Sequence, residues 1–104
     1  RQPDLIIGNC FNDSCAPALS RYVADYFTQK GLSVTFNVPY SGGFNTRHYS
    51  SREENRHVLQ LEFNRAIYMN EKTFEKNTGF EALQTLITDL AQDLNQKIND
   101  LLKS

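Results

Sequence analysis

Residues 57–65 alternate between apolar and polar side chains, and this pattern constrains the fold more than any other in the chain. Successive side chains of a strand point to opposite faces of its sheet. The two expected faces carry Leu59, Leu61 and Phe63 on one side, and Gln60, Glu62 and Asn64 on the other. Such a strand requires an apolar layer on one face, and water or polar partners for the carboxylate of Glu62 on the other.

The first third of the chain predicts a strand followed by a helix. Leu5–Gly8 is a short apolar run that ends in glycine, which is typical of a buried strand. Apolar side chains then recur at helical spacing, and Pro17 suits the first turn because no backbone donor is needed there. We expect Ser14 or Asp13 to cap this helix and Gly31 to end it.

A second strand at Leu32–Val38 and a long C-terminal helix from about Phe80 complete the pattern. The helix repeats leucine or isoleucine every three or four residues, which favours packing across a sheet. A coiled-coil seam is the alternative, although few charges flank the stripe in a pairing pattern. The order β-α-β-β-α predicts an α/β fold, part of a mixed sheet flanked by helices, with a parallel right-handed crossover between the first two strands.

Size and composition limit the class of protein. The 104 residues suffice for one domain, and a formal net charge of −1 argues against nucleic acid or an anionic membrane as the main partner. No apolar run approaches the roughly 20 residues that a membrane span requires. Cys10 and Cys15 are too few for a disulfide scaffold and are wrongly spaced for a CxxC metal site, so we expect reduced thiols in a cytoplasmic protein.

Three strands are few for a sheet of this kind, and the chain starts at Arg1 rather than at methionine, with a strand almost at once. We therefore expect residues 1–104 to form a single α/β unit of an incomplete domain. The expected partner is a missing N-terminal half or another copy of the chain.

The long loop 40–56 is the first candidate for chemistry, because loops of this length are usually functional or mobile. Gly42 and Gly43 give its backbone freedom. His48 can be a metal ligand or a structural hydrogen-bonding residue, since one imidazole alone makes no zinc site. His57 precedes Leu59 on the apolar face and is expected to be structural.

The alternating strand supplies the second candidate. Glu62 can act as a general base, or it can pair with an arginine such as Arg65, and the residues alone leave both possibilities open. Arg47 and Arg65 can bind a carboxylate through two hydrogen bonds, or they can be ordinary surface residues. Asn37, Tyr40 and Tyr68 are candidates for the lining of a cleft, and nothing local settles their role.

Four blocks of the chain, in order DLIIGN, SCAPAL, VPYSGGFNTRHY and HVLQLEFNRAIYM, resemble the C-terminal half of the N-formylglutamate amidohydrolase family. The resemblance extends over nearly the whole chain. The family is similar to zinc carboxypeptidases and aspartoacylases, which implies a zinc-exopeptidase-like, phosphorylase/hydrolase-like fold with a central mixed sheet. It also implies zinc as cofactor and removal of an N-formyl or N-acyl group from glutamate or a similar small acidic amino acid.

The resemblance carries over to individual residues. His48 in TRHY matches a late histidine ligand of the metal, and Glu62 in LQLEFNR matches the carboxylate that activates the metal-bound water. The expected substrate-binding residues are Arg65, Tyr68, Arg47, Gly42 and Gly43. Ser50 departs from the glycine that the family commonly has after His-Tyr, and the early histidine block is absent, so we expect an incomplete zinc site and an inactive chain in isolation.

Three functions therefore compete. The first is the C-terminal portion of a zinc-dependent amidohydrolase. The second is a non-catalytic binding domain that retains the fold without the metal site. The third is an interaction protein that associates through the apolar stripe of its long helix, Leu83–Leu101.

Overall fold

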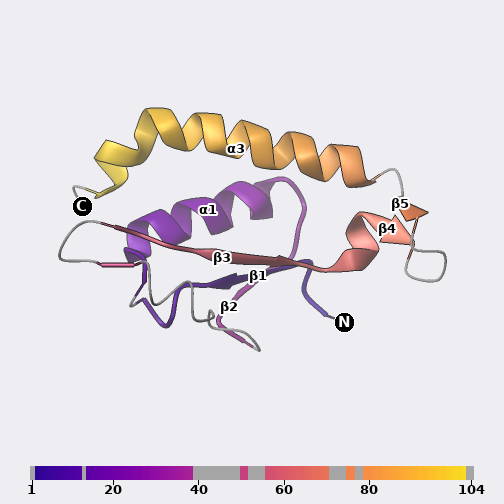
Figure 1. The fold of residues 1–104 in the computed structure, drawn as a ribbon, viewed down its shortest axis with the longest axis horizontal. Helices are drawn as coiled ribbons and strands as arrows, with labels where there is room; N and C mark the ends of the chain where they lie inside the picture. Colours follow the sequence, from indigo (N-terminus) through magenta and orange to yellow (C-terminus); the bar gives the residue numbers. More distant parts are fainter. Residues whose placement is uncertain are drawn as a thin grey trace.

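The computed structural model describes residues 2–12, 14–38, 50–51, 56–70, 75–76 and 79–102. These residues form a three-stranded sheet of order β2-β1-β3, with two α-helices stacked over it (Figure 1). The elements are β1 (Leu5–Gly8), α1 (Pro17–Gln29), β2 (Val34–Phe36), β3 (Gln60–Phe63), the 3₁₀ turn η1 (Arg65–Ile67), β4 (Met69–Asn70), β5 (Glu75–Lys76) and α3 (Gly79–Leu102). The predicted β-α-β-β-α order is confirmed, and β4 and β5 add a short antiparallel ribbon.

The sheet is mixed, as predicted, because its central strand β1 has partners of opposite direction. β1 runs parallel to β2, with Leu5 opposite Val34. It runs antiparallel to β3, with Leu5 opposite Phe63 and Ile7 opposite Leu61. Side chains at paired positions share a face. The apolar side chains of the three strands therefore form one continuous surface beneath the helices.

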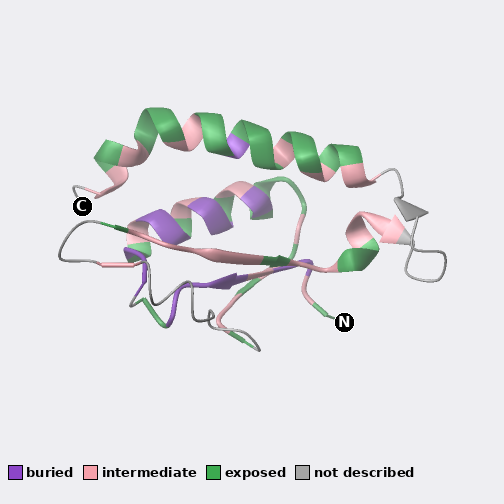
Figure 2. Cartoon of the chain, viewed as in Figure 1, coloured by how far each residue is buried: buried purple, intermediate pink, exposed green. Residues whose placement is uncertain are grey.

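The core lies between this surface and the helices. Its buried members are Leu5, Ile7, Val23, Ala24, Phe27 and Leu90. Phe27 has no exposed surface and packs edge-to-face on Phe63, with ring centroids 5.5 Å apart. Figure 2 shows that the buried residues gather in β1 and on the sheet-facing side of α1. The crossover helix and the central strand therefore build most of the core.

The start of α1 differs from expectation. The N-cap is Ala16 rather than Ser14, and Asp13 lies outside the described residues. The Ser14 hydroxyl instead donates to the carbonyl oxygen of Val58, at 2.8 Å. The backbone N–H of Ala16 donates to Nδ1 of His57, at 2.9 Å. The acceptor at this helix end thus comes from the segment that leads into β3, and this bond gives His57 the structural role predicted for it.

The end of α1 is as predicted. Gly31 follows the C-cap with φ of +92°, a backbone conformation that side chains with a Cβ disfavour. Its N–H donates to Thr28 and that of Leu32 donates to Phe27, at 3.0 and 3.1 Å. These two bonds form a Schellman motif, which satisfies the last carbonyls of the helix and turns the chain toward β2.

The strands are shorter than expected because their ends turn early. β2 stops at Phe36, since Asn37 adopts φ of +62° and cannot continue an extended strand. β3 stops at Phe63, and the side chain of Asn64 then accepts the N–H of Ala66 to begin η1. The chain therefore turns near Ala66.

The long helix α3 lies over α1 and along β3 (Figure 1). The hydroxyl of Tyr26 donates to the carbonyl oxygen of Leu86, at 3.1 Å, and the hydroxyl of Tyr22 donates to Asp93. Lys97 of α3 donates to the Tyr22 hydroxyl at 3.2 Å and lies 3.0 Å from the Asp93 carboxylate on its own helix. These contacts join the two helices through polar groups at the border of the core. Neither described helix is long and apolar enough to cross a membrane.

Candidate functional site

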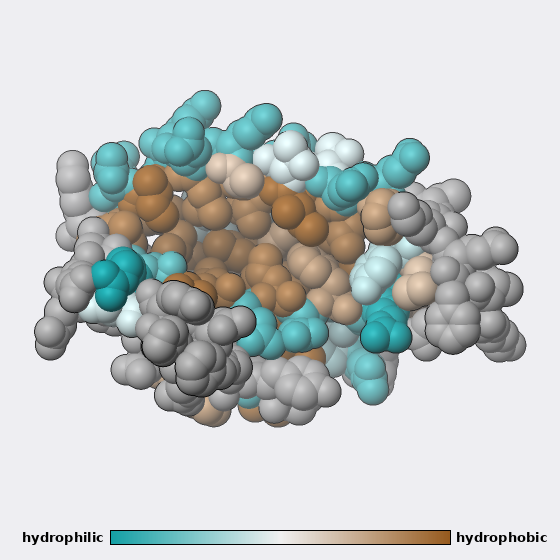
Figure 3. All heavy atoms as spheres, viewed as in Figure 1, coloured by the Kyte–Doolittle hydropathy of each residue, from teal (hydrophilic) through white to brown (hydrophobic). Residues whose placement is uncertain are grey.

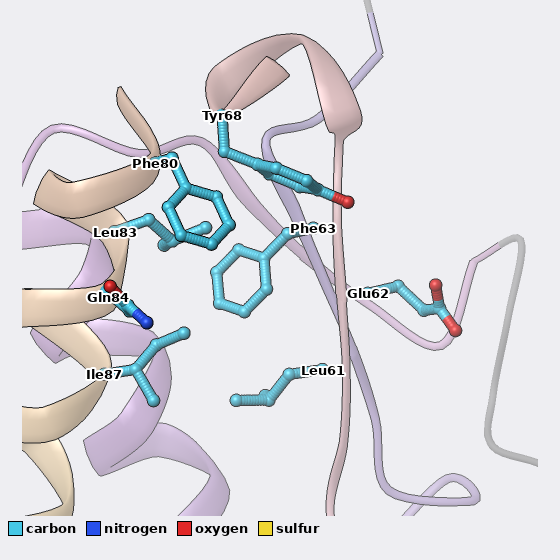
Figure 4. A pocket seen from close by; sticks show the side chains of 8 residues that line it. All are labelled: Leu61, Glu62, Phe63, Tyr68, Phe80, Leu83, Gln84 and Ile87. Carbon is cyan, nitrogen blue, oxygen red and sulfur yellow. The ribbon is translucent and has the colours of Figure 1, made fainter. Parts of the chain in front are cut away.

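The predicted division of β3 into two faces is present. Figure 4 shows Leu61 and Phe63 pointing toward α3, while the carboxylate of Glu62 points away from them. Glu62 is exposed, and its register partner on β1 is Ile6. The Nε2 group of Gln60, the next side chain on that face, donates to Oε1 of Glu62 at 2.9 Å. The carboxylate therefore lies on the face of the sheet opposite α1 and α3, oriented by its neighbour.

Of the two arginines proposed for carboxylate binding, the structure describes Arg65. It begins the η1 turn and is exposed. Within the described part of the chain, Arg65 makes no ion pair with Glu62. The possibility that these two residues neutralise each other is thus not realised, and both charged groups face solvent.

Tyr68 lies in a different environment from the carboxylate of Glu62. It is half-buried, and its ring packs against that of Phe80 with centroids 6.3 Å apart. Both rings line a hollow of about 330 Å³ between β3 and α3. Its walls are Leu61, Glu62, Phe63, Tyr68, Phe80, Leu83, Gln84 and Ile87. Figure 3 shows apolar side chains gathered over this side of the molecule, so the hollow suits apolar contacts.

Four of the predicted site residues lie outside the described residues: Gly42, Gly43, Arg47 and His48. Their proposed roles therefore stay predictions. Among the residues that the structure does describe, no group of three or more His, Cys, Asp or Glu side chains could hold a metal ion. A zinc ion would need ligands from beyond these ranges.

A polar site occupies the carboxyl ends of β1 and β2, and the sequence had suggested only one of its members, Asn37, as a residue that lines a cleft. Asn9, 1% exposed, accepts at Oδ1 from Nδ2 of Asn37 at 2.9 Å and from the N–H of Asn12 at 3.0 Å. Its Nδ2 donates to Oδ1 of Asn12 and to Oγ of Ser20, both at 3.0 Å. Oδ1 of Asn37 accepts the N–H of Asn9 at 3.1 Å. We call Asn9, Asn12, Ser20 and Asn37 the amide cluster.

Unusual backbone conformations surround the amide cluster. Cys10, Phe11 and Asn12 have φ of +52°, +54° and +71°, and Asn37 has φ of +62°. Residues other than glycine adopt this region rarely, and asparagine is the type that tolerates it best. In the sequence, Asn9 directly follows a predicted strand, whereas Asn37 falls inside the predicted strand Leu32–Val38. The hydrogen bond between these two asparagines, which are 28 residues apart, could not be predicted from the sequence.

Beside the amide cluster is a second hollow, of about 300 Å³. Its lining comprises Asn9, Asn12, Pro17, Ser20, Arg21, Phe36 and Asn37. The guanidinium carbon of Arg21 lies 5.6 Å from the centre of the Phe36 ring, which is a cation–π contact. This hollow is polar and carries a positive charge, in contrast to the apolar one near Tyr68.

The sheet is mixed, helices are stacked on one of its faces, and a polar edge lies at the carboxyl ends of its parallel strands. This is an α/β architecture. Comparison with known proteins identifies the particular family. The model of the N-formylglutamate amidohydrolase family matches residues 1–69. The chain belongs to this family, as the sequence resemblance implied.

Relatives support the assignment. The N-formylglutamate deformylase of Pseudomonas aeruginosa is 34% identical over 105 residues, which cover 100% of this chain and 36% of the relative. That of Pseudomonas putida is 33% identical over 70 residues, 66% of this chain and 26% of the relative. The crystal structure of N-formylglutamate amidohydrolase from Ralstonia eutropha JMP134 matches with a TM-score of 0.88 at 31% identity, over 95% of this chain and 35% of that one.

The structural match confirms the predicted fold class. The chain spans about a third of the length of the relatives it matches. What those longer proteins do as a whole is therefore a proposal for this chain.

Proposed function

We propose that this chain is the C-terminal portion of a zinc-dependent amidohydrolase that removes the formyl group from N-formylglutamate, or an acyl group from a similar acidic amino acid. Family membership over residues 1–69, a range that includes Glu62 and Arg65, is the observation that carries the proposal. The names of both curated relatives, N-formylglutamate deformylase, agree with it.

Glu62 is the proposed general base. Its carboxylate is exposed on a face of the sheet that α1 and α3 leave open, and a neutral donor, Gln60, holds one of its oxygens at 2.9 Å. In the proposed reaction Glu62 accepts a proton from the attacking water and delivers it to the amide nitrogen as the C–N bond breaks. The products are formate and the free amine of glutamate.

Zinc is proposed as the cofactor, with His48 as one of its ligands. When bound, zinc in such a site lowers the pKa of water to about 7 and polarises the acyl oxygen. The described residues hold no complete ligand set, so the other ligands are proposed to come from the missing N-terminal half or from another copy of the chain.

Arginine is proposed to hold a carboxylate of the substrate. Arg65 is exposed and has no ion-pair partner within the described residues, so its guanidinium can take a carboxylate through two hydrogen bonds. Arg47 is the second proposed arginine, and Tyr68, Gly42 and Gly43 complete the proposed substrate-binding set.

The decisive experiment replaces the proposed base in the longest natural form of the protein. Glu62→Gln keeps the size of the side chain and removes its ability to accept a proton. We expect hydrolysis of N-formylglutamate to slow by about 10²- to 10⁴-fold, the usual contribution of a general base. Zinc content by elemental analysis and the melting temperature are expected to stay unchanged.

A matched control is Glu81→Gln, which neutralises an exposed carboxylate in the first turn of α3. It is expected to leave turnover unchanged. Normal turnover by Glu62→Gln would exclude the general base assignment. A protein that binds N-formylglutamate but neither contains zinc nor hydrolyses the substrate would instead support the non-catalytic binding domain.

A further inference from the structure

The polar hollow beside the amide cluster has the position of a ligand site. β1 and β2 are parallel, and the hollow is lined by the residues that follow their carboxyl ends, Asn9 and Asn37, and by the first turns of α1. In open α/β sheets, ligands bind outside the carboxyl ends of the parallel strands. A volume of about 300 Å³ is at the small end of ligand pockets, which suits a small molecule.

The groups lining this hollow are mainly hydrogen-bond donors, because the amide oxygens are already occupied. Oδ1 of Asn9 accepts two N–H groups, Oδ1 of Asn37 accepts those of Asn9 and Phe11, and Oδ1 of Asn12 accepts from Asn9. Nδ2 of Asn37 donates one of its two N–H groups to Oδ1 of Asn9. Its second N–H meets no acceptor among the described residues.

Arg21 adds charge to these donors. Its guanidinium carries five N–H groups and has no carboxylate partner in the described ranges. Contact with the face of Phe36, at 5.6 Å, leaves the edge of the guanidinium available for hydrogen bonds. No described residue that lines the hollow is acidic, and the first turn of α1 contains no acidic residue. The combination favours an anion.

Strain around the same hollow supports a functional role. Four residues other than glycine, Cys10, Phe11, Asn12 and Asn37, have positive φ there. Conformations of this kind are unfavourable for residues other than glycine and concentrate at ligand-binding and catalytic sites. The side chain of Asn9, fully hydrogen-bonded and 1% exposed, holds two of these residues, Asn12 and Asn37. Three hydrogen bonds, two with Asn9 and one from the N–H of Phe11, thus orient the Asn37 amide.

We propose that this hollow binds the carboxylate of a small organic acid, with the guanidinium of Arg21 as the charged contact and Nδ2 of Asn37 as the neutral donor. The site is separate from the carboxylate of Glu62, which lies on the face of the sheet that the helices do not cover. The inference does not rest on the proposed hydrolysis. Carboxylate binding can fail while turnover remains dependent on Glu62, and the reverse also holds.

The test is a titration of ¹⁵N-labelled protein, followed by NMR at constant ionic strength. The probes are glutarate, the matched neutral glutaramide, and inorganic phosphate. We expect saturable shifts with glutarate in the Asn37 side-chain amide and the Arg21 Nε–H signals, and none with glutaramide. Equal shifts with glutaramide would overturn a carboxylate site, and saturation by phosphate alone would replace it with a phosphate site.

Two variants give the test its control. Arg21→Gln changes an exposed side chain, so the fold is expected to survive, and glutarate affinity is expected to fall by about tenfold or more because a charge-assisted bond is lost. Lys30→Gln removes the same charge from the other end of α1 and is expected to leave affinity within about twofold, because exposed charges at that distance are screened. Unchanged affinity in Arg21→Gln would overturn the proposal.

Discussion

The two helices α1 and α3 share an amphipathic pattern but differ in how many of their residues are buried. The shorter α1 buries Leu19, Ser20, Val23, Ala24 and Phe27, whereas the longer α3 buries Leu90 alone among its described residues. Figure 2 shows this contrast as a purple face on α1 and a mostly green and pink α3. A similar stripe of apolar residues therefore leads to very different degrees of burial.

The difference follows from the position of each helix. α1 connects the parallel strands β1 and β2, so it must pack directly on the sheet, and α3 covers it from the other side (Figure 1). α3 packs against α1 and beside the edge strand β3, and Ile87 in its stripe remains 40% exposed. Apolar periodicity thus predicts which face of a helix turns inward, but the topology decides how completely that face is covered.

The largest expected effect is that of Phe27→Ala in α1. The ring is fully buried and contacts Tyr26 and Phe63 edge-to-face, with centroids 5.2 and 5.5 Å away. Its removal leaves a cavity in the middle of the core, and we expect a loss of about 3–5 kcal/mol in the free energy of unfolding. Urea denaturation measures this loss. A value below about 1 kcal/mol would show that α1 does not anchor the core.

A smaller effect is expected from Leu90→Ala in α3, because this side chain is 4% exposed but lies at the outer boundary of the core. We expect a loss of about 2–3 kcal/mol by the same measurement. Ile87→Ala is the matched control one turn earlier, and it is expected to cost less than about 1 kcal/mol since it is already 40% exposed. Equal losses would contradict the burial that distinguishes the two positions.

The smallest effect concerns the polar link between the helices. The hydroxyl of Tyr22 and, secondly, Lys97 donate hydrogen bonds to Asp93 and lower the pKa of its carboxyl group below the ordinary 3.8. The charged form is therefore favoured by folding. Its contribution is present above about pH 3.8 and is lost as the pH falls through the lowered pKa of the folded state.

Asp93→Asn tests this link. We expect the variant to be slightly less stable than the parent at pH 7, and the difference to shrink as the pH falls below 4. Urea denaturation of both proteins between pH 3 and pH 7 measures it. If the difference stays the same at pH 3, the contribution of Asp93 does not depend on its charge.

Much of the fold could be predicted because it depends on local patterns. The side chains of Leu61 and Phe63 point to one face of the sheet and that of Glu62 to the other, because side chains alternate along any strand. Pro17 begins α1 and Gly31 ends it, because each residue meets a backbone requirement of its own position. The family resemblance of the blocks was also present in the residues themselves, and the match to residues 1–69 confirmed it.

The candidate sites were harder to predict because they depend on distant pairs. Ala16 bonds to His57 from 41 residues away, which replaced the expected cap by Ser14. Asn9 and Asn37, 28 residues apart, meet only because β1 and β2 lie side by side. Neither side chain has a local feature that would mark it as part of a ligand site, and Arg21 reads in the sequence as one more surface charge.

The amino-acid sequence by itself determined the order of the elements, the two faces of β3 and the family, because these follow from periodicity, from single residues and from contiguous blocks. The tertiary structure alone decided that α1 is buried more deeply than α3, and it alone created the amide cluster and the charged hollow beside it. Those features arise where segments far apart in the chain are brought together by strand pairing, and pairing depends on the free energy of the whole fold rather than on any local stretch.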